Sequence, residues 1–291
     1  MNSIFFSEFI QRIDQKLTEY LTGNLTNKLF EVMCYATLNG GKRIRPLLVL
    51  AGGTIAKSDY ENMIEIASAI EIIHCYSLIH DDLPSMDNDD LRRGKLTAHK
   101  KFSEGFAILA GDALQSLAFT ILSDSKLNIS DTKKVKLINL ISKSIGAYGM
   151  AGGQALDLLN TGKKSTLEQL EKMHLMKTGA LIQASLLSGY IIGNIFKQNH
   201  FDILDKVASD FGLLYQIVDD ILDATSNTNI LGKTANKDLV NNKFTYVTYL
   251  GYDEAKIKAQ YLYELINKNL SILPNNEFLI ELTDYIYDRK K

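Results

Sequence analysis

Hydrophobic residues recur along most of the chain at the spacing of an α-helix, and strand-like alternation is scarce. Only three prolines interrupt 291 residues, so few positions break a helix, and Pro46 suits a first helical turn. The pattern therefore predicts an all-α fold. The expected helices cover 4–20, 26–38, 45–57, 60–83, 104–123, 130–147, 166–195, 201–225, 236–249, 253–268 and 275–288.

No composition change divides the chain. We find no Pro/Ser-rich linker, no low-complexity tract and no repeat of fixed period. The simplest expectation is one domain over residues 1–291.

The stretch GLLYQIVDDILD at 212–223 places three carboxylates on one side of a predicted helix. At about 100° per residue, Asp219, Asp220 and Asp223 fall within about 60° of Gln216, and aliphatic residues occupy the opposite arc. Two carboxylates about 4 Å apart repel by roughly 4 kcal/mol at an effective dielectric of about 20, so a buried cluster needs a counter-charge such as Mg²⁺. An exposed acidic stripe is the alternative, although the segment holds no Lys or Glu neighbour.

A second acidic stretch, HDDLPSMDNDD, covers residues 80–90 at the end of an apolar predicted helix. Asp81 and Asp82 close that helix, and the next acid is Asp87, just past Pro84. Asp87 returns toward Asp81 only if the chain leaves the helix, which Pro84 favours. A solvated acidic loop is the alternative for this run taken alone.

The two acidic clusters are far apart along the chain, because 138 residues separate Asp81 from Asp219. If the two helices face each other, the clusters could hold metal ions between them. Mg²⁺ typically uses one or two carboxylates together with phosphate groups of a substrate.

Several basic groups could supply the partner of such an anion. They are Lys42, Arg43 and Arg45 in GGKRIRP, Arg92, Arg93 and Lys95 in LRRGK, Lys177 beside Thr178 in MKTG, Lys233 and Lys237 in LGKTANKD, and Lys243 in NNK. The spacing GxxxxGK[ST] is absent from GGKRIRP, so a nucleotide P-loop is not expected. Taken singly, any of these lysines is an ordinary surface residue. The whole set suggests diphosphates held by Mg²⁺.

The overall composition bears on which binding partners and which cellular compartment are expected. Lys and Arg number 32 against 34 Asp and Glu, so no basic excess indicates nucleic acid or an anionic membrane. Cys34 and Cys75 sit among apolar residues, which indicates two buried thiols in a reduced, cytoplasmic protein. The first fourteen residues lack a signal-peptide pattern. No spanning helix is expected, and residues 179–195 come closest to one.

In order, the chain reads GGKRIRP, HCYSLIHDDLPSMDNDDLRRG, AGDAL, GMAGGQALD, MKTGALI, YQIVDDILD, LGKTANKD and NNKFTY. These motifs resemble the trans-isoprenyl diphosphate synthases from about residue 25 to the C-terminal YIYDRKK, and most closely the bacterial farnesyl diphosphate synthase group. The resemblance implies the all-α isoprenoid synthase fold with a deep central cavity. It also implies a homodimer and small-molecule isoprenoid diphosphates as substrates.

The resemblance also implies a role for each matching residue. Three Mg²⁺ ions, which Mn²⁺ could replace, are expected on Asp81, Asp82, Asp87, Asp219, Asp220 and Asp223. Isopentenyl diphosphate is expected on Lys42, Arg45, His74 and Arg93. The allylic diphosphate is expected on Arg92, Lys177, Thr178, Gln216, Lys233 and Lys243, and Lys177, Thr178 and Gln216 also flank the reacting carbons.

Two residues ahead of the first acidic cluster bear on product length. Ser77 lies one turn before Asp81 on the same helical face, and Tyr76 precedes it. In the family that the chain resembles, bulk here and the two-residue insertion before Asp87 imply a fifteen-carbon product. Geranyl and geranylgeranyl diphosphate stay open as alternatives.

The chain departs from the family pattern at Tyr215, Asn236 and Val247, where Phe, Gly and Pro are common. No departure removes a charged residue. A class I terpene cyclase would usually lack the second Asp-rich motif, and a non-catalytic prenyltransferase subunit tends to lose such motifs. Both motifs are intact here, so these two alternatives rank below a synthase.

Overall fold

The computed structural model describes residues 4–22, 27–160, 162–163, 166–225 and 245–289. The helices are α1 (Ile4–Thr22), α2 (Lys28–Thr37), α3 (Ile44–Ala56), α4 (Tyr60–Asp81), α5 (Ala98–Lys101), α6 (Glu104–Ser123), α7 (Asp131–Ile145), α8 (Met150–Asn160), α9 (Leu167–His174), α10 (Ala180–Ile191), α11 (Gln198–Thr225), α14 (Tyr246–Leu250), α15 (Tyr252–Leu270) and α16 (Glu277–Tyr287), with a π-helical turn η1 (Leu175–Gly179) between α9 and α10. The all-α prediction is confirmed.

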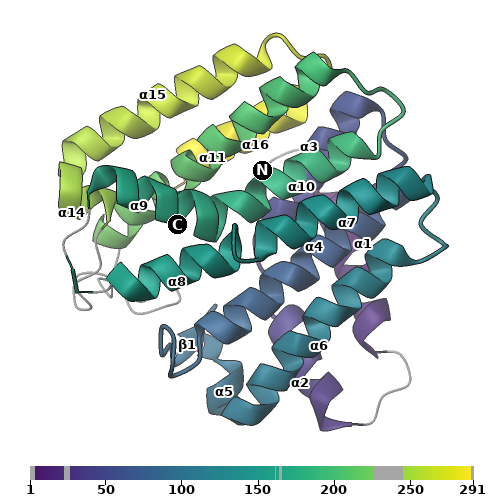
Figure 1. Cartoon of the computed structure of the whole chain (residues 1–291), viewed down its shortest axis with the longest axis vertical. Coiled ribbons are helices and arrows are strands. Elements are labelled where there is room, and N and C mark those ends of the chain that lie inside the picture. Colours follow the sequence, from purple (N-terminus) through teal and green to yellow (C-terminus); the bar gives the residue numbers. More distant parts are fainter. Residues whose placement is uncertain (1–3, 23–26, 161, 164–165, 226–244, 290–291) are drawn as a thin grey trace.

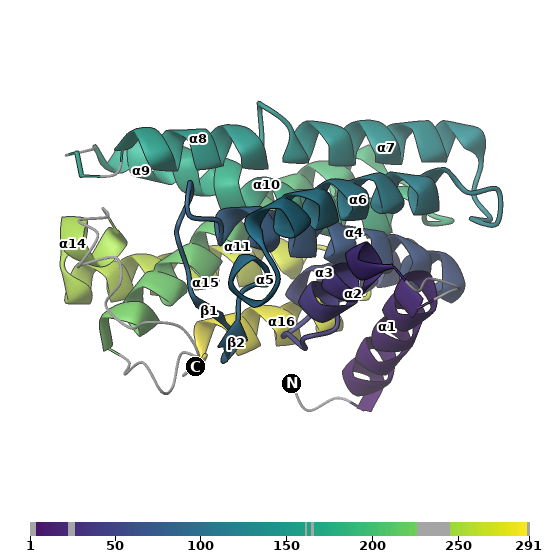
Figure 2. The same ribbon diagram turned by 90° about the horizontal axis from the view of Figure 1, so that it is seen from below.

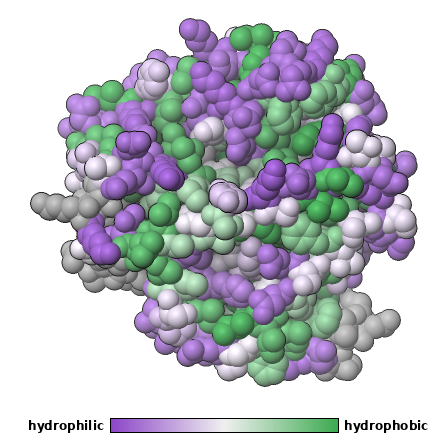
Figure 3. Space-filling model, viewed as in Figure 1, coloured by the Kyte–Doolittle hydropathy of each residue, from purple (hydrophilic) through white to green (hydrophobic). Residues whose placement is uncertain are grey.

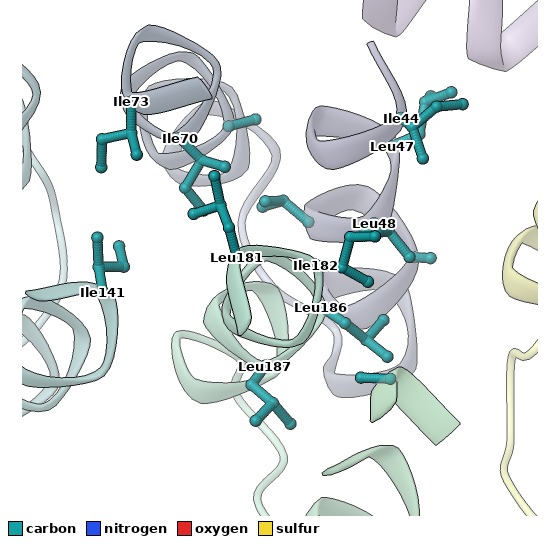
Figure 4. Packing of buried hydrophobic residues seen from close by; sticks show 14 of the residues in the cluster. Ile44, Leu47, Leu48, Ile70, Ile73, Ile141, Leu181, Ile182, Leu186 and Leu187 are labelled. Atoms are coloured by element: carbon teal, nitrogen blue, oxygen red, sulfur yellow. The ribbon is translucent and has the colours of Figure 1, made fainter. Parts of the chain in front are cut away.

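Four helices, α3, α4, α10 and α11, lie in the middle of the molecule, and the others pack around them (Figure 1 and Figure 2). Helix α10 packs along α3, α4 along α6, and α11 along α15. In the core, Ile70 and Ile73 of α4 lie near Leu181 of α10, and Leu48 of α3 lies near Ile182 (Figure 4). The periodicity of the sequence therefore located the buried helix faces.

Glycines let α3 and α10 approach at backbone distance. A Cβ atom added to Gly189 would stand 2.0 Å from the Val49 carbonyl oxygen, and one added to Gly52 would stand 2.0 Å from the Leu186 carbonyl oxygen. No side chain fits either position. The two helices are therefore in contact along their small residues, which fixes how α10 lies against α3.

Helix α8 was not predicted; it lies between the predicted helices 130–147 and 166–195 and contains Gly152 and Gly153. In the structure these glycines serve close packing. A Cβ atom on Gly153 would stand 2.1 Å from the Lys177 backbone nitrogen, so α8 can lie directly against η1.

Smaller features also differ from the prediction, and one of them is the short helix α5, which was not predicted. Strands β1 (Leu91–Arg92) and β2 (Lys95–Leu96) form an antiparallel hairpin whose turn residues, Arg93 and Gly94, both have positive φ. The single predicted helix over 166–195 is divided by η1 into α9 and α10. Helix α4 ends at Asp81 rather than at residue 83.

Two described helices, α4 and α6, are long and apolar enough to cross a membrane by length and composition alone. In α4, 72% of the apolar window is buried within the protein, and in α6 39% is buried. A core helix meets the same criterion, so the finding is weak evidence for a membrane segment. Seen from the side shown in Figure 3, the surface mixes hydrophilic residues with scattered hydrophobic ones.

Candidate active site

A pocket of about 250 Å³ gathers carboxylates from both predicted acidic clusters. Helices α4, α8 and α11 supply them, together with the turn after α4. The acidic lining residues are Asp81, Asp87, Asp89, Asp157, Asp219, Asp220 and Asp223. The prediction that the two clusters face each other is therefore confirmed, although 138 residues separate them along the chain.

The first cluster forms because the chain turns back directly after α4. The Asp87 backbone nitrogen donates to the Asp81 carbonyl oxygen at 2.8 Å, and the Asp89 nitrogen donates to the Asp82 carbonyl oxygen at 3.2 Å. Pro84 lies inside this turn, as the sequence predicted. The fold-back brings Asp87 beside Asp81, and it also brings Asp89, which sequence reasoning missed.

Asp82 differs from its neighbours because it does not line the pocket. It is 4% exposed, and its Oδ1 atom accepts from Arg92 Nε at 3.0 Å. Burial raises the pKa of Asp82, and the hydrogen bond from Arg92 opposes that rise. The pair also fixes Arg92, whose side chain lines the pocket.

Burial and a neighbouring carboxylate both act on the pKa of Asp81. Burial raises the pKa of Asp81 to about 6, Lys177 opposes the rise, and the negative charge of Asp87 adds to it. A pocket that raises a carboxyl pKa in this way favours the binding of a cation.

The second cluster projects from α11 as predicted, with Leu214, Ile217 and Val218 buried on the other side. Asp220 is held by two donors, the Tyr246 backbone nitrogen at 2.8 Å and Gln216 Nε2 at 3.0 Å. Gln216 Oε1 in turn accepts from the Thr178 hydroxyl at 3.3 Å. Thr178 and Gln216 thus face the pocket as one hydrogen-bonded unit.

Two cations contact these acids from elements distant in sequence. Lys177 Nζ lies 2.7 Å from Asp157 Oδ2 and 3.9 Å from Asp87 Oδ2. Arg289, near the C-terminus, forms an ion pair with Asp219 and lies over the Tyr215 ring, 5.0 Å from its centroid. Neither Asp157 nor Arg289 was predicted as a site residue. Asp157 ends the motif GQALD, and that was the only available signal.

A second pocket of about 450 Å³ is basic. The four residues predicted to bind isopentenyl diphosphate, Lys42, Arg45, His74 and Arg93, all line it. Arg45 and His74 line the acidic pocket too, so the two pockets adjoin at these side chains. Arg45 Nη1 lies 3.4 Å from His74 Nε2, and Arg45 Nε is buried without a hydrogen-bond partner.

Burial lowers the pKa values of two residues in this basic pocket, His74 and Lys42. Together with the nearby charges of Arg45 and Arg93, burial lowers the pKa of His74 well below its ordinary value. The imidazole is therefore neutral at pH 7. Burial, followed by the charge of Arg289, lowers the pKa of Lys42 to about 8. Cations held this close to one another, with a buried guanidinium nitrogen left unbonded, suit an anionic ligand.

The acidic pocket fits metal binding by its donor chemistry rather than by a preformed cage. Among the described residues, no three His, Cys, Asp or Glu side chains stand close enough to hold an ion together. Asp82 and Asp219 pair with arginines instead. Mg²⁺ commonly takes only one or two carboxylates and completes its shell with water and phosphate oxygens. The residues present match that mode.

Besides Asp82, three predicted site residues either line neither pocket or lie outside the described residues. Ser77 lines the acidic pocket, whereas Tyr76 does not and packs edge-on against His80, with ring centroids 5.9 Å apart. Lys233 and Lys243 lie outside the described residues, as does the departure at Asn236.

Comparison with known proteins agrees with this arrangement. The family model for polyprenyl synthetase matches residues 26–277. The chain is 42% identical to a farnesyl diphosphate synthase of Haemophilus influenzae over 98% of this chain and 99% of that one. It is 41% identical to a chloroplastic geranylgeranyl pyrophosphate synthase of Capsicum annuum over 97% of this chain and 77% of that one.

Solved structures give the same result. The crystal structure of a geranyltransferase from Helicobacter pylori, complexed with magnesium and isoprenyl diphosphate, superposes with a TM-score of 0.83 at 33% identity, covering 98% of this chain and 97% of that one. The isoprenoid synthase fold predicted from the sequence is thereby confirmed. With the family model matching most of its length, the chain belongs to the polyprenyl synthetase family.

Proposed function

We propose that this chain is a prenyltransferase that condenses isopentenyl diphosphate with dimethylallyl and then geranyl diphosphate to give (2E,6E)-farnesyl diphosphate. One observation carries the proposal: an acidic pocket and a basic pocket adjoin at Arg45 and His74. Two diphosphates can then bind side by side. Several relatives that match nearly the whole chain are named farnesyl diphosphate synthase, and one is named geranylgeranyl pyrophosphate synthase.

The acidic pocket receives the allylic diphosphate. Lys177 and Arg92 line it and carry positive charge toward the departing diphosphate, which stabilises the negative charge that grows as the allylic C–O bond breaks. The bonding electron pair leaves with the diphosphate and an allylic carbocation remains. The hydroxyl of Thr178 and the amide oxygen of Gln216 face that position and steady the cation by their dipoles.

The basic pocket holds isopentenyl diphosphate through Lys42, Arg45, His74 and Arg93. Its double bond attacks the cation and forms the new carbon–carbon bond, and a proton is then lost to the released diphosphate. Neutral His74 does not add to the charge of the pocket, and its Nε2 atom accepts from Arg45 Nη1. Met150 and Met173 also line the acidic pocket, where apolar side chains help exclude the water that would quench the cation.

Enzymes of this family generally depend on a metal ion, and we propose Mg²⁺, three ions, with Mn²⁺ as a substitute. Carboxylates of Asp81, Asp87, Asp219, Asp220 and Asp223 would hold them at the edge of the allylic diphosphate, with Asp82 contributing through Arg92. The bound ions supply electrophilic stabilisation of the leaving diphosphate. Lys233 and Lys243 are proposed as further contacts of that diphosphate.

We propose a fifteen-carbon product because Tyr76 and Ser77 lie on α4 about one turn before Asp81, where their bulk would limit chain growth. Geranylgeranyl diphosphate is the second candidate product, because a geranylgeranyl pyrophosphate synthase is nearly as similar to the chain as the farnesyl diphosphate synthases.

The test is to incubate the purified protein with isopentenyl diphosphate, dimethylallyl diphosphate and Mg²⁺, and to size the products by mass spectrometry. We expect a fifteen-carbon diphosphate that disappears when EDTA is added. A twenty-carbon product would keep the chemistry and overturn the product assignment. No elongation at all would overturn the proposed function.

We further propose a single-domain, cytoplasmic homodimer with no nucleic-acid or membrane partner. Helix α6 presents Phe106, Ile108 and Leu109 at 36%, 44% and 54% exposure, and a second copy could cover this apolar surface. Light scattering after gel filtration should give twice the chain mass of 32.6 kDa. A monomeric mass would contradict the dimer.

A further inference from the structure

We propose that a buried ion pair between Arg43 and Glu71 is the positioning element of the basic pocket. It would hold Lys42 and Arg45 against helix α4 in the geometry that isopentenyl diphosphate requires. The inference rests on the proposed function, and it assigns a role to two residues outside the predicted ligand set.

The Arg43 guanidinium is buried and fully engaged. Its side chain is 2% exposed, as is that of Glu71. Arg43 Nη1 donates to Glu71 Oε1 at 2.7 Å, and Arg43 Nε donates to Asp14 Oδ1 at 3.0 Å. Nη2 also donates to the Thr37 carbonyl oxygen at 3.4 Å. Side chain and backbone groups from α1, α2 and α4 therefore meet on one arginine.

The backbone at Arg43 needs such an anchor. Arg43 has φ 50° and ψ 36°, in the left-handed region, directly before the first residue of α3. A residue with a Cβ atom adopts this conformation at a cost, unless its surroundings impose it. The preceding Gly40 and Gly41 also have positive φ. The reversal that these three residues make places Lys42 and Arg45 in the lining of the pocket on either side of Arg43, which lines it too although its side chain is almost fully buried.

Glu71 connects this backbone reversal to helix α4, which also lines the pocket. It lies on α4 three residues before His74, hence one turn away on the same side. The ion pair thus joins the loop bearing Lys42 and Arg45 to the helix bearing His74, and Arg45 Nη1 lies 3.4 Å from His74 Nε2. A shift of the loop would separate groups that must contact one diphosphate together.

Glu71 also balances charge. The basic pocket already brings together Lys42, Arg45 and Arg93. Arg43 adds a fourth positive charge, and Glu71 neutralises it at 2.7 Å. Without the Glu71 carboxylate, the buried guanidinium would keep only the half-exposed Asp14 carboxylate and the Thr37 carbonyl oxygen as partners, and its charge would repel the neighbouring cations more strongly.

The test compares Arg43→Lys, Glu71→Gln and Asp14→Asn with wild type by steady-state kinetics, varying each diphosphate separately. Arg12→Gln is the matched control, because Arg12 also bridges α1 to α4, through Glu61, but at the exposed surface. We expect Arg43→Lys and Glu71→Gln to raise KM for isopentenyl diphosphate by about tenfold or more, with KM for the allylic substrate within about twofold. Arg12→Gln should match wild type.

Asp14→Asn is the variant that decides if the other two do not fold, since it weakens the anchoring of Arg43 by changing a side chain that is half exposed. It should raise KM for isopentenyl diphosphate about threefold and leave the other constants unchanged. An unchanged KM in folded variants, or an equal loss toward both substrates, overturns the inference. Wild-type turnover in the same assay tests the proposed function separately.

Discussion

At the scale of single residues, Lys177 is held by a partner that the sequence did not identify. Its Nζ atom lies 2.7 Å from Asp157, and the next acid, Asp87, is 3.9 Å away. Asp157 therefore keeps the ammonium group at one side of the acidic pocket. Without it, Lys177 would be drawn toward the carboxylates of the first cluster and would neutralise them.

Asp157→Asn should lower kcat by about 10–100-fold while the protein stays folded, because the amide keeps the shape and loses the charge. The matched control is Glu171→Gln, which breaks an ion pair with Lys258 outside both pockets. Wild-type kcat in Asp157→Asn would show that the ion pair does not position Lys177.

Lys42 makes substrate affinity depend on pH. With its pKa lowered to about 8, Lys42 is mostly charged at pH 7 and mostly neutral at pH 9. KM for isopentenyl diphosphate should therefore rise between pH 7 and 9, as the cation that binds the diphosphate is lost. Lys42→Arg keeps its charge over this range. Equal pH profiles for the two proteins would argue against this role.

Tyr76 is buried next to the acidic pocket without lining it. Tyr76→Ala should open space under Asp81 and lengthen the products, whereas Tyr76→Phe keeps the ring and should not. Mass spectrometry of the products separates the two cases. An unchanged product distribution in Tyr76→Ala would refute the role of Tyr76 in chain length.

Most charged site residues could be predicted because each belongs to a motif whose residues lie within a few positions of one another in the sequence. Asp157 and Arg289 could not, since their importance comes from contacts across 20 and 70 residues of sequence. The four predicted residues of the basic pocket all line it, but the buried Arg43–Glu71 pair in the same lining depends on a backbone reversal that composition does not reveal.

At the scale of helices, the α3–α10 contact depends on glycine. Gly189→Ala should lower the free energy of unfolding by about 3 kcal/mol or more, because the added methyl group would overlap the Val49 carbonyl oxygen. Gly105→Ala is the control, as nothing lies within 4 Å of its added Cβ atom. It should stabilise the protein by about 0.4–1 kcal/mol.

Denaturant unfolding of both variants checks this prediction. Equal stability in the two would mean that α3 and α10 can separate at little cost.

Most helices were predictable from periodicity, but some elements were not. The close packing that Gly153 of α8 allows against η1 is visible only in the structure. The hairpin at Leu91–Leu96 spans too few residues to show alternation, and a π-helical turn leaves the hydrophobic pattern nearly unchanged.

At the scale of the whole molecule, the fold brings together two acidic clusters and a basic pocket that the sequence keeps apart. Helices α4 and α11 supply the acids, and the segment before α3 supplies the bases. The central claim is that both acidic clusters act on one diphosphate. Each should then be indispensable on its own.

The most direct measurement is the rate of Mg²⁺-dependent farnesyl diphosphate formation by Asp81→Ala and Asp219→Ala. The control is Asp112→Ala, whose side chain is 61% exposed on α6 and lines neither pocket. We predict a loss of about 100-fold or more in each of the first two variants and none in the control. A near-normal rate in either Asp81→Ala or Asp219→Ala would contradict the account.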